Sequence, residues 1–375
     1  MRKRAVICFV IILWLLSGCW DQHLLKDNSL VLGIGLDASK GEKIVNTAVI
    51  RLLKSESGGT GKPSSTNVLY SATGNTFRET RAGIEKQLGG EYAPNKLRVL
   101  VIGEELAGKD IYPILDILYR DPRNSLTAKL VVAQGTAKEL LKIKKSKEVF
   151  ISEKLLDVVN RSEERTLIPI ETIQSICPDL FDPGKDFALP YVTYKGSDSI
   201  EIQGMALFHD KKFTGTIMEG EDATVLLYLN GEEGNVARFT LKVNPEEARR
   251  QNQFISISSF LKDHNLKVKV DKHHKISAEI TLKINITAIE YPLNQLSKQT
   301  EINKLNKEIS KLLTQRAEFV IKELQQANCD YFGIGRKVMA YHPETWKAIN
   351  WADTFPTIDI KTKIETNITG TGIIK

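Results

Sequence analysis

Cys19 is the residue whose neighbours give it the most specific chemistry in this sequence. It follows Leu16, Ser17 and Gly18. Small residues directly before a cysteine are what a lipoprotein signal peptidase accepts once a diacylglyceryl group has been joined to the thiol. The spacing therefore predicts a lipid on Cys19 and cleavage of the chain between Gly18 and Cys19.

The segment before Cys19 has the composition that such processing requires. Arg2, Lys3 and Arg4 form a positive start, and residues 5–16 are uncharged and apolar. Twelve residues rise only about 18 Å as a helix, which is short of the roughly 30 Å hydrocarbon core of a bilayer. This run resembles a bacterial lipobox signal more closely than an uncleaved signal anchor, the alternative. We expect the mature protein to sit on a membrane, outside the cytoplasm, held by acyl chains.

Composition limits the remaining possibilities. The chain has 375 residues, of which 42% are hydrophobic and 26% charged, so it can bury a core and predicts two or three domains. The net charge is +6, and three of the positive charges lie in the predicted signal segment, which argues against a nucleic-acid partner. The four cysteines lack Cys-x-x-Cys spacing, which excludes zinc ribbons and thioredoxin-type motifs. Cys177 and Cys329 either pair or stay free, and the sequence favours free thiols.

The first part of the mature chain, residues 19–197, predicts an α/β-type domain in which strands and helices alternate. Pro113 is expected to kink or split one of the helices, and Asn75 is the expected N-cap of another. The expected strands are 28–37, 42–53, 68–72, 97–102 and 126–133, and the expected helices are 77–88, 104–119, 137–144, 151–160 and 170–176. Residues 55–67 read as a flexible loop.

A small middle domain, residues 198–248, and a C-terminal domain, residues 249–375, follow. The middle domain begins with a hairpin of 200–208 and 212–218. In the C-terminal domain, residues 276–288 and 358–368 alternate apolar and polar side chains, and we expect them to be neighbours in an antiparallel sheet. Apolar residues at three- and four-residue steps over 302–324 predict a long helix that covers this sheet. The fold class is thus α+β, a three-domain ectodomain of mixed sheets and helices.

Several motifs resemble sites but lack the required context. Gly33-Ile34-Gly35-Leu36-Asp37-Ala38 matches a dinucleotide fingerprint, but a strand and not a helix is expected next, so its glycines indicate close backbone packing. His273 and His274 read as a solvated turn, and His209 as part of a hairpin tip. We predict no catalytic residues, no metal site and no cofactor.

Short segments spread along the whole chain resemble the Ger(x)C family, the lipoprotein C subunits of the nutrient germinant receptors of bacterial spores. One departure is Asn95-Lys96-Leu97, where the family usually has a Gly-His pair, so no role of that histidine is carried over. The matching segments are Leu16-Ser17-Gly18-Cys19-Trp20-Asp21, Gly33-Ile34-Gly35-Leu36-Asp37, Val99-Leu100-Val101-Ile102-Gly103-Glu104-Glu105-Leu106-Ala107, Arg120-Asp121, Leu189-Pro190, Gly204-Met205-Ala206-Leu207-Phe208, Asp330-Tyr331-Phe332-Gly333-Ile334-Gly335, and the pair Trp346 and Trp351.

The resemblance implies a non-catalytic subunit, anchored on the outer face of the spore inner membrane, that triggers germination with two partners. These are a polytopic membrane subunit and a second subunit with a cytosolic domain. Trp346 and Trp351 are candidate partner-binding residues, because large aromatic side chains often anchor interfaces, although such residues are more often core. The alternative is a solute-binding lipoprotein that delivers a small nutrient to a transporter, which would require two doubly wound lobes around a cleft.

Overall fold

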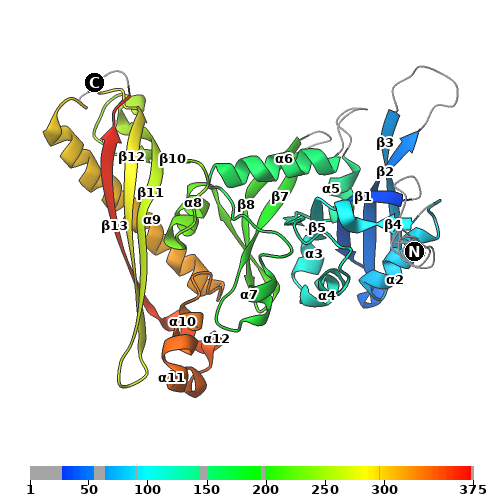
Figure 1. The fold of residues 1–375 in the computed structure, drawn as a ribbon. Coiled ribbons are helices and arrows are strands. Elements are labelled where there is room, and N and C mark those ends of the chain that lie inside the picture. Colours follow the sequence, from blue (N-terminus) through cyan, green and yellow to red (C-terminus); the bar gives the residue numbers. More distant parts are fainter. Residues whose placement is uncertain are drawn as a thin grey trace, which may run out of the picture.

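A computed structural model describes residues 28–54, 64–89, 91–143, 151–195, 199–294 and 296–372. These residues form two sheets that lie toward opposite ends of an elongated molecule (Figure 1). The first sheet has nine strands and the second has four. The mixed architecture confirms the predicted α+β class.

The first sheet is parallel in its centre and antiparallel at both sides. Its order is β3-β2-β1-β5-β6-β7-β8-β9, and β4 pairs with β1 away from this path. Strands β1, β5, β6 and β7 run parallel, whereas the pairs at each side of them are antiparallel. The strands are β1 (Asn28–Ala38), β2 (Ile44–Lys54), β3 (Ser64–Gly74), β4 (Glu91–Ala93), β5 (Val99–Gly103), β6 (Lys129–Ala133), β7 (Ala188–Lys195), β8 (Ser199–His209) and β9 (Lys212–Glu219).

Helices cover both faces of the first sheet, which explains why its central strands are apolar throughout. In β5, Val99 and Val101 belong to one core cluster, whereas Leu100 and Ile102 belong to the other. Pro113 lies in the first turn of a new helix, so the expected helix 104–119 is split as predicted. The helices of this region are α2 (Phe77–Glu85), α3 (Glu104–Ala107), α4 (Tyr112–Arg120), α5 (Ala137–Lys142), α6 (Ile151–Glu164) and α7 (Cys177–Phe181).

Three local expectations need correction. Residues 64–67, expected in a flexible loop, belong to strand β3, and the rest of that loop lies outside the described residues. The N-cap of α2 is Thr76 and not Asn75, since the Thr76 hydroxyl accepts a hydrogen bond from the Glu79 amide at 3.1 Å. Residues 170–176 form turns and not a helix. There the Ser175 hydroxyl accepts a hydrogen bond from the Thr172 amide at 2.8 Å, and the Thr172 hydroxyl accepts one from the Ser175 amide at 3.1 Å. These hydrogen bonds compete with those of a helix.

The second sheet has the order β10-β11-β12-β13, and helix α9 lies along it. Strands β10, β11 and β12 are antiparallel, but the expected antiparallel pairing of 276–288 with 358–368 is wrong, because β13 pairs with β12 in parallel. The reason is the 28-residue helix α9, about 42 Å long, which carries the chain back along the sheet before β13 begins. The elements are β10 (Ala237–Lys242), β11 (Phe254–Val270), β12 (Ile276–Glu290), α9 (Gln299–Gln326), α10 (Ile334–Tyr341), α11 (Pro343–Ala348), α12 (Trp351–Thr354) and β13 (Asp359–Gly370).

Helix α8 (Gly220–Leu229) joins the two sheets. All seven residues from Ala223 to Leu229 are buried, because the helix packs on β8 and β9 on one side and on α9 and the second sheet on the other. The predicted middle segment, 198–248, is thus shared: the hairpin of β8 and β9 extends the first sheet, and β10 belongs to the second. The three-domain division itself stays a prediction.

Candidate functional site

We call the part of the molecule that holds the first sheet the first half and the part that holds the second sheet the second half. These halves, which α8 joins, also meet at a contact that we call the seam. It consists of residues 179–187, around and after α7, and residues 330–336, which lead into α10. The Asp186 amide donates to the Asp330 carbonyl at 3.0 Å, and the Asp330 amide donates to the Asp186 carboxylate at 2.9 Å. The Arg336 amide donates to the Gly184 carbonyl at 2.7 Å. Backbone and side-chain hydrogen bonds together thus fix which residues of the two segments lie next to each other.

Ion pairs strengthen the seam. The Arg336 guanidinium contacts Asp179 at 2.7 Å and also pairs with Asp182. Lys185 pairs with Asp179 at 3.3 Å. Both Asp179 and Asp182 are mostly shielded from water, so these charge-assisted contacts are screened less than pairs on an open surface.

Asp330 is the most deeply buried charged residue of the seam. Its carboxylate accepts hydrogen bonds from the amides of Ile334 at 3.0 Å and Gly335 at 2.7 Å, which satisfies amides at the start of α10. Burial raises the pKa of Asp330 to about 7, and the nearby charge of Asp186 adds to this rise, while the backbone amides oppose it. Asp330 therefore positions α10 against the first half of the molecule.

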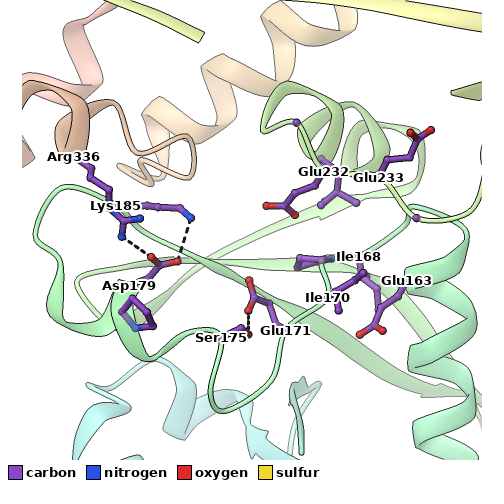
Figure 2. Close-up of a pocket in the computed structure, with 15 residues that line it drawn as sticks. Glu163, Ile168, Ile170, Glu171, Ser175, Asp179, Lys185, Glu232, Glu233 and Arg336 are labelled. Carbon is purple, nitrogen blue, oxygen red and sulfur yellow. Dashed lines mark hydrogen bonds and ion pairs between the residues drawn. The ribbon is translucent and has the colours of Figure 1, made fainter. Parts of the chain in front are cut away.

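A cavity of about 570 Å³ lies beside the seam. Figure 2 shows Glu171, from the turn before α7, and Glu232, from the loop after α8, reaching into it from opposite walls. Glu171 accepts a hydrogen bond from Ser175, and Glu232 accepts one from the Tyr331 hydroxyl at 3.0 Å. The cavity is therefore lined by carboxylates from both halves, with Arg336 and Lys185 at one end (Figure 2).

Burial raises the pKa of two facing carboxyl groups of this cavity, Glu171 and Glu232. Burial raises the pKa of Glu171 to about 7, and the charges of Glu232 and Asp179 contribute to the same shift. Burial also raises the pKa of Glu232, although Asn230 and Tyr331 donate hydrogen bonds to it. The negative charges of these carboxylates repel one another, and separation of the two halves would relieve this repulsion. Ionisation of the carboxyl groups therefore opposes closure of the seam.

We expect the protein to be more stable at pH 5 than at pH 8. In the folded protein the pKa of Glu171 lies above its ordinary value. The contribution of this group to stability is therefore complete below the ordinary pKa and is lost as the pH rises through the folded-state pKa of about 7. Between pH 5 and pH 8, the unfolding free energy of Glu171→Gln should fall by about 1 to 2 kcal/mol less than that of the wild type, as measured by urea unfolding. Glu365→Gln is the control, since Lys363 lowers the pKa of that exposed carboxyl and its titration lies below this range. An identical pH dependence in Glu171→Gln and the wild type would contradict the assignment.

A second cavity, of about 460 Å³, shares Asp179 and Lys185 with the first and is lined by both predicted tryptophans. The rings of Trp346 and Trp351 lie 5.4 Å apart between centroids, and Trp351 also contacts Phe355 at 6.0 Å. Trp351 is only 9% exposed and belongs to the core, whereas Trp346 is half-buried. The structure thus brings the two tryptophans together, and Trp346 keeps the larger accessible surface. Their predicted role in partner binding stays a prediction.

The apparent motifs have structural explanations in the described residues. A Cβ on Gly35 would lie 2.8 Å from Leu141, so this glycine allows α5 to pack closely on β1, as expected. His274, in the turn between β11 and β12, contacts the Thr345 hydroxyl at 2.7 Å. His209 contacts the Asp186 carboxylate at 3.1 Å and so touches the seam, which its place in a hairpin tip did not indicate.

The remaining candidate residues are cysteines. Cys177 and Cys329 are free thiols, and Cys329 is fully buried. Gly18 and Cys19 lie outside the described residues. Over the described ranges, no helix is long and apolar enough to cross a membrane, and no three ligating side chains gather in a way that could hold a metal ion.

Sequence reasoning missed Asp186, Asp330 and Arg336 as a connected group. Asp330 was noted only as part of a family signature, and Asp186 not at all. Asp330, three residues before the N-cap Gly333, accepts hydrogen bonds from the amides of Ile334 and Gly335, so its position does not follow the usual N-cap spacing and gave no local signal. Nothing local indicates that Arg336 pairs with residues more than 150 positions earlier.

Comparison with known proteins gives matches along nearly the whole chain. Residues 21–194 match the family model "Spore germination protein N-terminal domain", and residues 203–372 match "Spore germination B3/ GerAC like, C-terminal". The spore germination protein GerQC of Bacillus cereus is 25% identical over 368 residues, which cover 98% of each chain. The spore germination protein KC of Bacillus subtilis (strain 168) is 23% identical and covers 98% of this chain and 96% of its own.

The fold is also similar to a solved structure. The crystal structure of the GerBC protein superposes with a TM-score of 0.55 at 16% identity, covering 90% of this chain and 97% of that chain. The two family models follow each other without overlap, and together they account for both sheets and the seam. The chain therefore belongs to the Ger(x)C family of spore germination proteins.

Proposed function

We propose that this protein is the lipid-anchored, non-catalytic subunit of a nutrient germinant receptor complex that triggers spore germination. The observation that carries the proposal is the match of the whole described chain to spore germination proteins. The predicted lipid on Cys19 would place it on the outer face of the spore inner membrane. Its action would be protein–protein contact with a polytopic membrane subunit and a second subunit with a cytosolic domain.

The geometry supports an orientation within that complex. Only the eight residues 20–27 separate Cys19 from Asn28, the first residue of β1, and they span at most about 28 Å. Strands β1 and β4 lie toward one end of the molecule, and the second sheet lies at the other (Figure 1). The first sheet would therefore stand next to the membrane subunits.

The alternative, a solute-binding lipoprotein for a transporter, has less support. That function calls for two doubly wound lobes around a cleft. The second sheet here is four-stranded, with alternating buried and exposed residues along β12 and one long helix packed on its apolar face. The 570 Å³ cavity at the seam is bordered by the ion pair of Arg336 with Asp179, which holds the two halves together.

Deletion of the gene in its native spore former tests the proposal. We expect nutrient-triggered dipicolinate release to be lost for at least one nutrient and restored by the wild-type gene. A tagged full-length copy in spore membranes is expected to co-purify with the polytopic subunit from detergent extracts. Unchanged responses to every nutrient, with no membrane subunit recovered, would contradict the receptor role.

A further inference from the structure

We propose that the cavity lined by Trp346 and Trp351 binds a small organic ammonium compound that carries an apolar group. This cavity, which we call the aromatic cavity, has walls from both halves of the molecule. Residues 179–187 and 209–211 come from the first half, and residues 346–352 come from the second. The proposal does not depend on the receptor role, because it concerns a ligand and not a protein partner.

One wall of the aromatic cavity is apolar and accessible. Trp346 is half-buried and rests on Trp351, which fixes its orientation. Phe181, another lining residue, is 60% exposed, although its ring makes an edge contact with Tyr112 at 5.1 Å. An exposed phenylalanine and a half-buried tryptophan in one cavity leave apolar surface in water, and a ligand that covers both would gain free energy.

The hairpin tip between β8 and β9 supplies a negative charge to the same cavity. Within the described ranges, the Asp210 carboxylate makes no hydrogen bond or ion pair. The cations nearby are already engaged: Lys185 pairs with Asp179 at 3.3 Å, and the Lys211 ammonium lies 5.9 Å from the centre of the Tyr112 ring. The carboxylate of Asp186 is paired with His209. Asp210, an exposed side chain whose charge helps to raise the pKa of the neighbouring His209, is therefore the acid of this cavity without a direct ion pair among the described residues.

These two features select a ligand class. The ammonium group of the ligand would pair with Asp210, and the apolar portion of the ligand would lie against Trp346 and Phe181. A volume of about 460 Å³ is within the usual size of small-molecule sites. Since the walls belong to both halves, a bound ligand would also stabilise the seam.

The test uses full-length protein in detergent and three probes. Phenethylamine has both the ammonium group and the ring, phenylacetate has the ring with a negative charge, and methylamine lacks the ring. We expect saturable binding of phenethylamine by calorimetry and by tryptophan fluorescence, with phenylacetate and methylamine at least about tenfold weaker.

Two variants locate the site. Asp210→Asn removes the charge at a position with φ of 46°, which asparagine adopts readily, and should weaken phenethylamine binding about fivefold. Trp346→Leu should weaken it about tenfold, with folding checked by circular dichroism. Asp263→Asn, an exposed acid on β11, is the matched control and should bind as the wild type does.

Three results would overturn the proposal. Phenylacetate binding as tightly as phenethylamine would remove the role of Asp210, and unchanged affinity in Asp210→Asn would do the same. Absence of phenethylamine binding, together with loss of cross-links to a membrane subunit in Trp346→Leu, would show that the aromatic cavity is a protein interface.

Discussion

Cys19→Ala should move the protein from the membrane fraction of the cell to the soluble fraction. Each methylene of an acyl chain contributes about 0.8 kcal/mol in the bilayer, so two or three chains hold a protein far more firmly than a single myristoyl group. Alanine cannot carry the diacylglyceryl group. The apolar segment 5–16 is too short to span the hydrocarbon core if it is retained.

The measurement is the share of the protein that sediments with membranes, which should fall from nearly all to a small fraction. Ser17→Ala is the matched control, because it exchanges one small residue for another before the same cysteine and should leave the protein on the membrane. Mass spectrometry of the mature N-terminus separates failed lipidation from failed export. Full membrane retention of Cys19→Ala would refute the predicted anchor and would also weaken the proposed orientation of the first sheet.

Sequence patterns predicted the elements of this fold better than their connections. The alternation in residues 276–288 and 358–368 placed β12 and β13 side by side correctly, since a period of two defines a strand with one buried face. It could not reveal their direction, because alternation looks the same in parallel and antiparallel pairs. The 17-residue strand β11 was not expected at all, because its alternation is interrupted: the apolar positions change from odd (Ile255, Ile257) to even (Leu266, Val268) across an irregularity between Leu261 and Asp263.

The candidate site was less accessible from the sequence than the fold. Trp346 and Trp351 stood out because of their size and spacing, and they do line one cavity. Glu171 and Glu232 did not stand out, since each is an ordinary acid in a polar turn, and only the fold brings them to facing walls. Side chains that act across a contact between distant segments leave no periodic signal in either segment.

Gly184→Ala is the substitution that we expect to damage the folded protein most severely. An ideal Cβ at Gly184 would lie 2.4 Å from the Arg336 amide nitrogen and 2.7 Å from the Gly335 carbonyl carbon. Both are backbone atoms, so no side chain can rotate away, and the hydrogen bond from the Arg336 amide to the Gly184 carbonyl must lengthen or break. We expect a loss of about 3 kcal/mol of unfolding free energy, measured by urea unfolding.

Gly89→Ala is the matched control, because nothing lies within 4 Å of a Cβ at that position, and it should change stability by less than about 0.5 kcal/mol. Displacement of the Arg336 backbone would also separate the guanidinium from Asp179 and withdraw α10 from the first half. The second sheet would then be held to the first through α8 and through the hydrogen bonds of Glu164 and Thr166 with residues 234–236. Hydrogen exchange should therefore rise first at the amides of Ile334 and Gly335, which Asp330 protects in the wild type. Equal stability of Gly184→Ala and Gly89→Ala would show that the seam does not depend on this close approach.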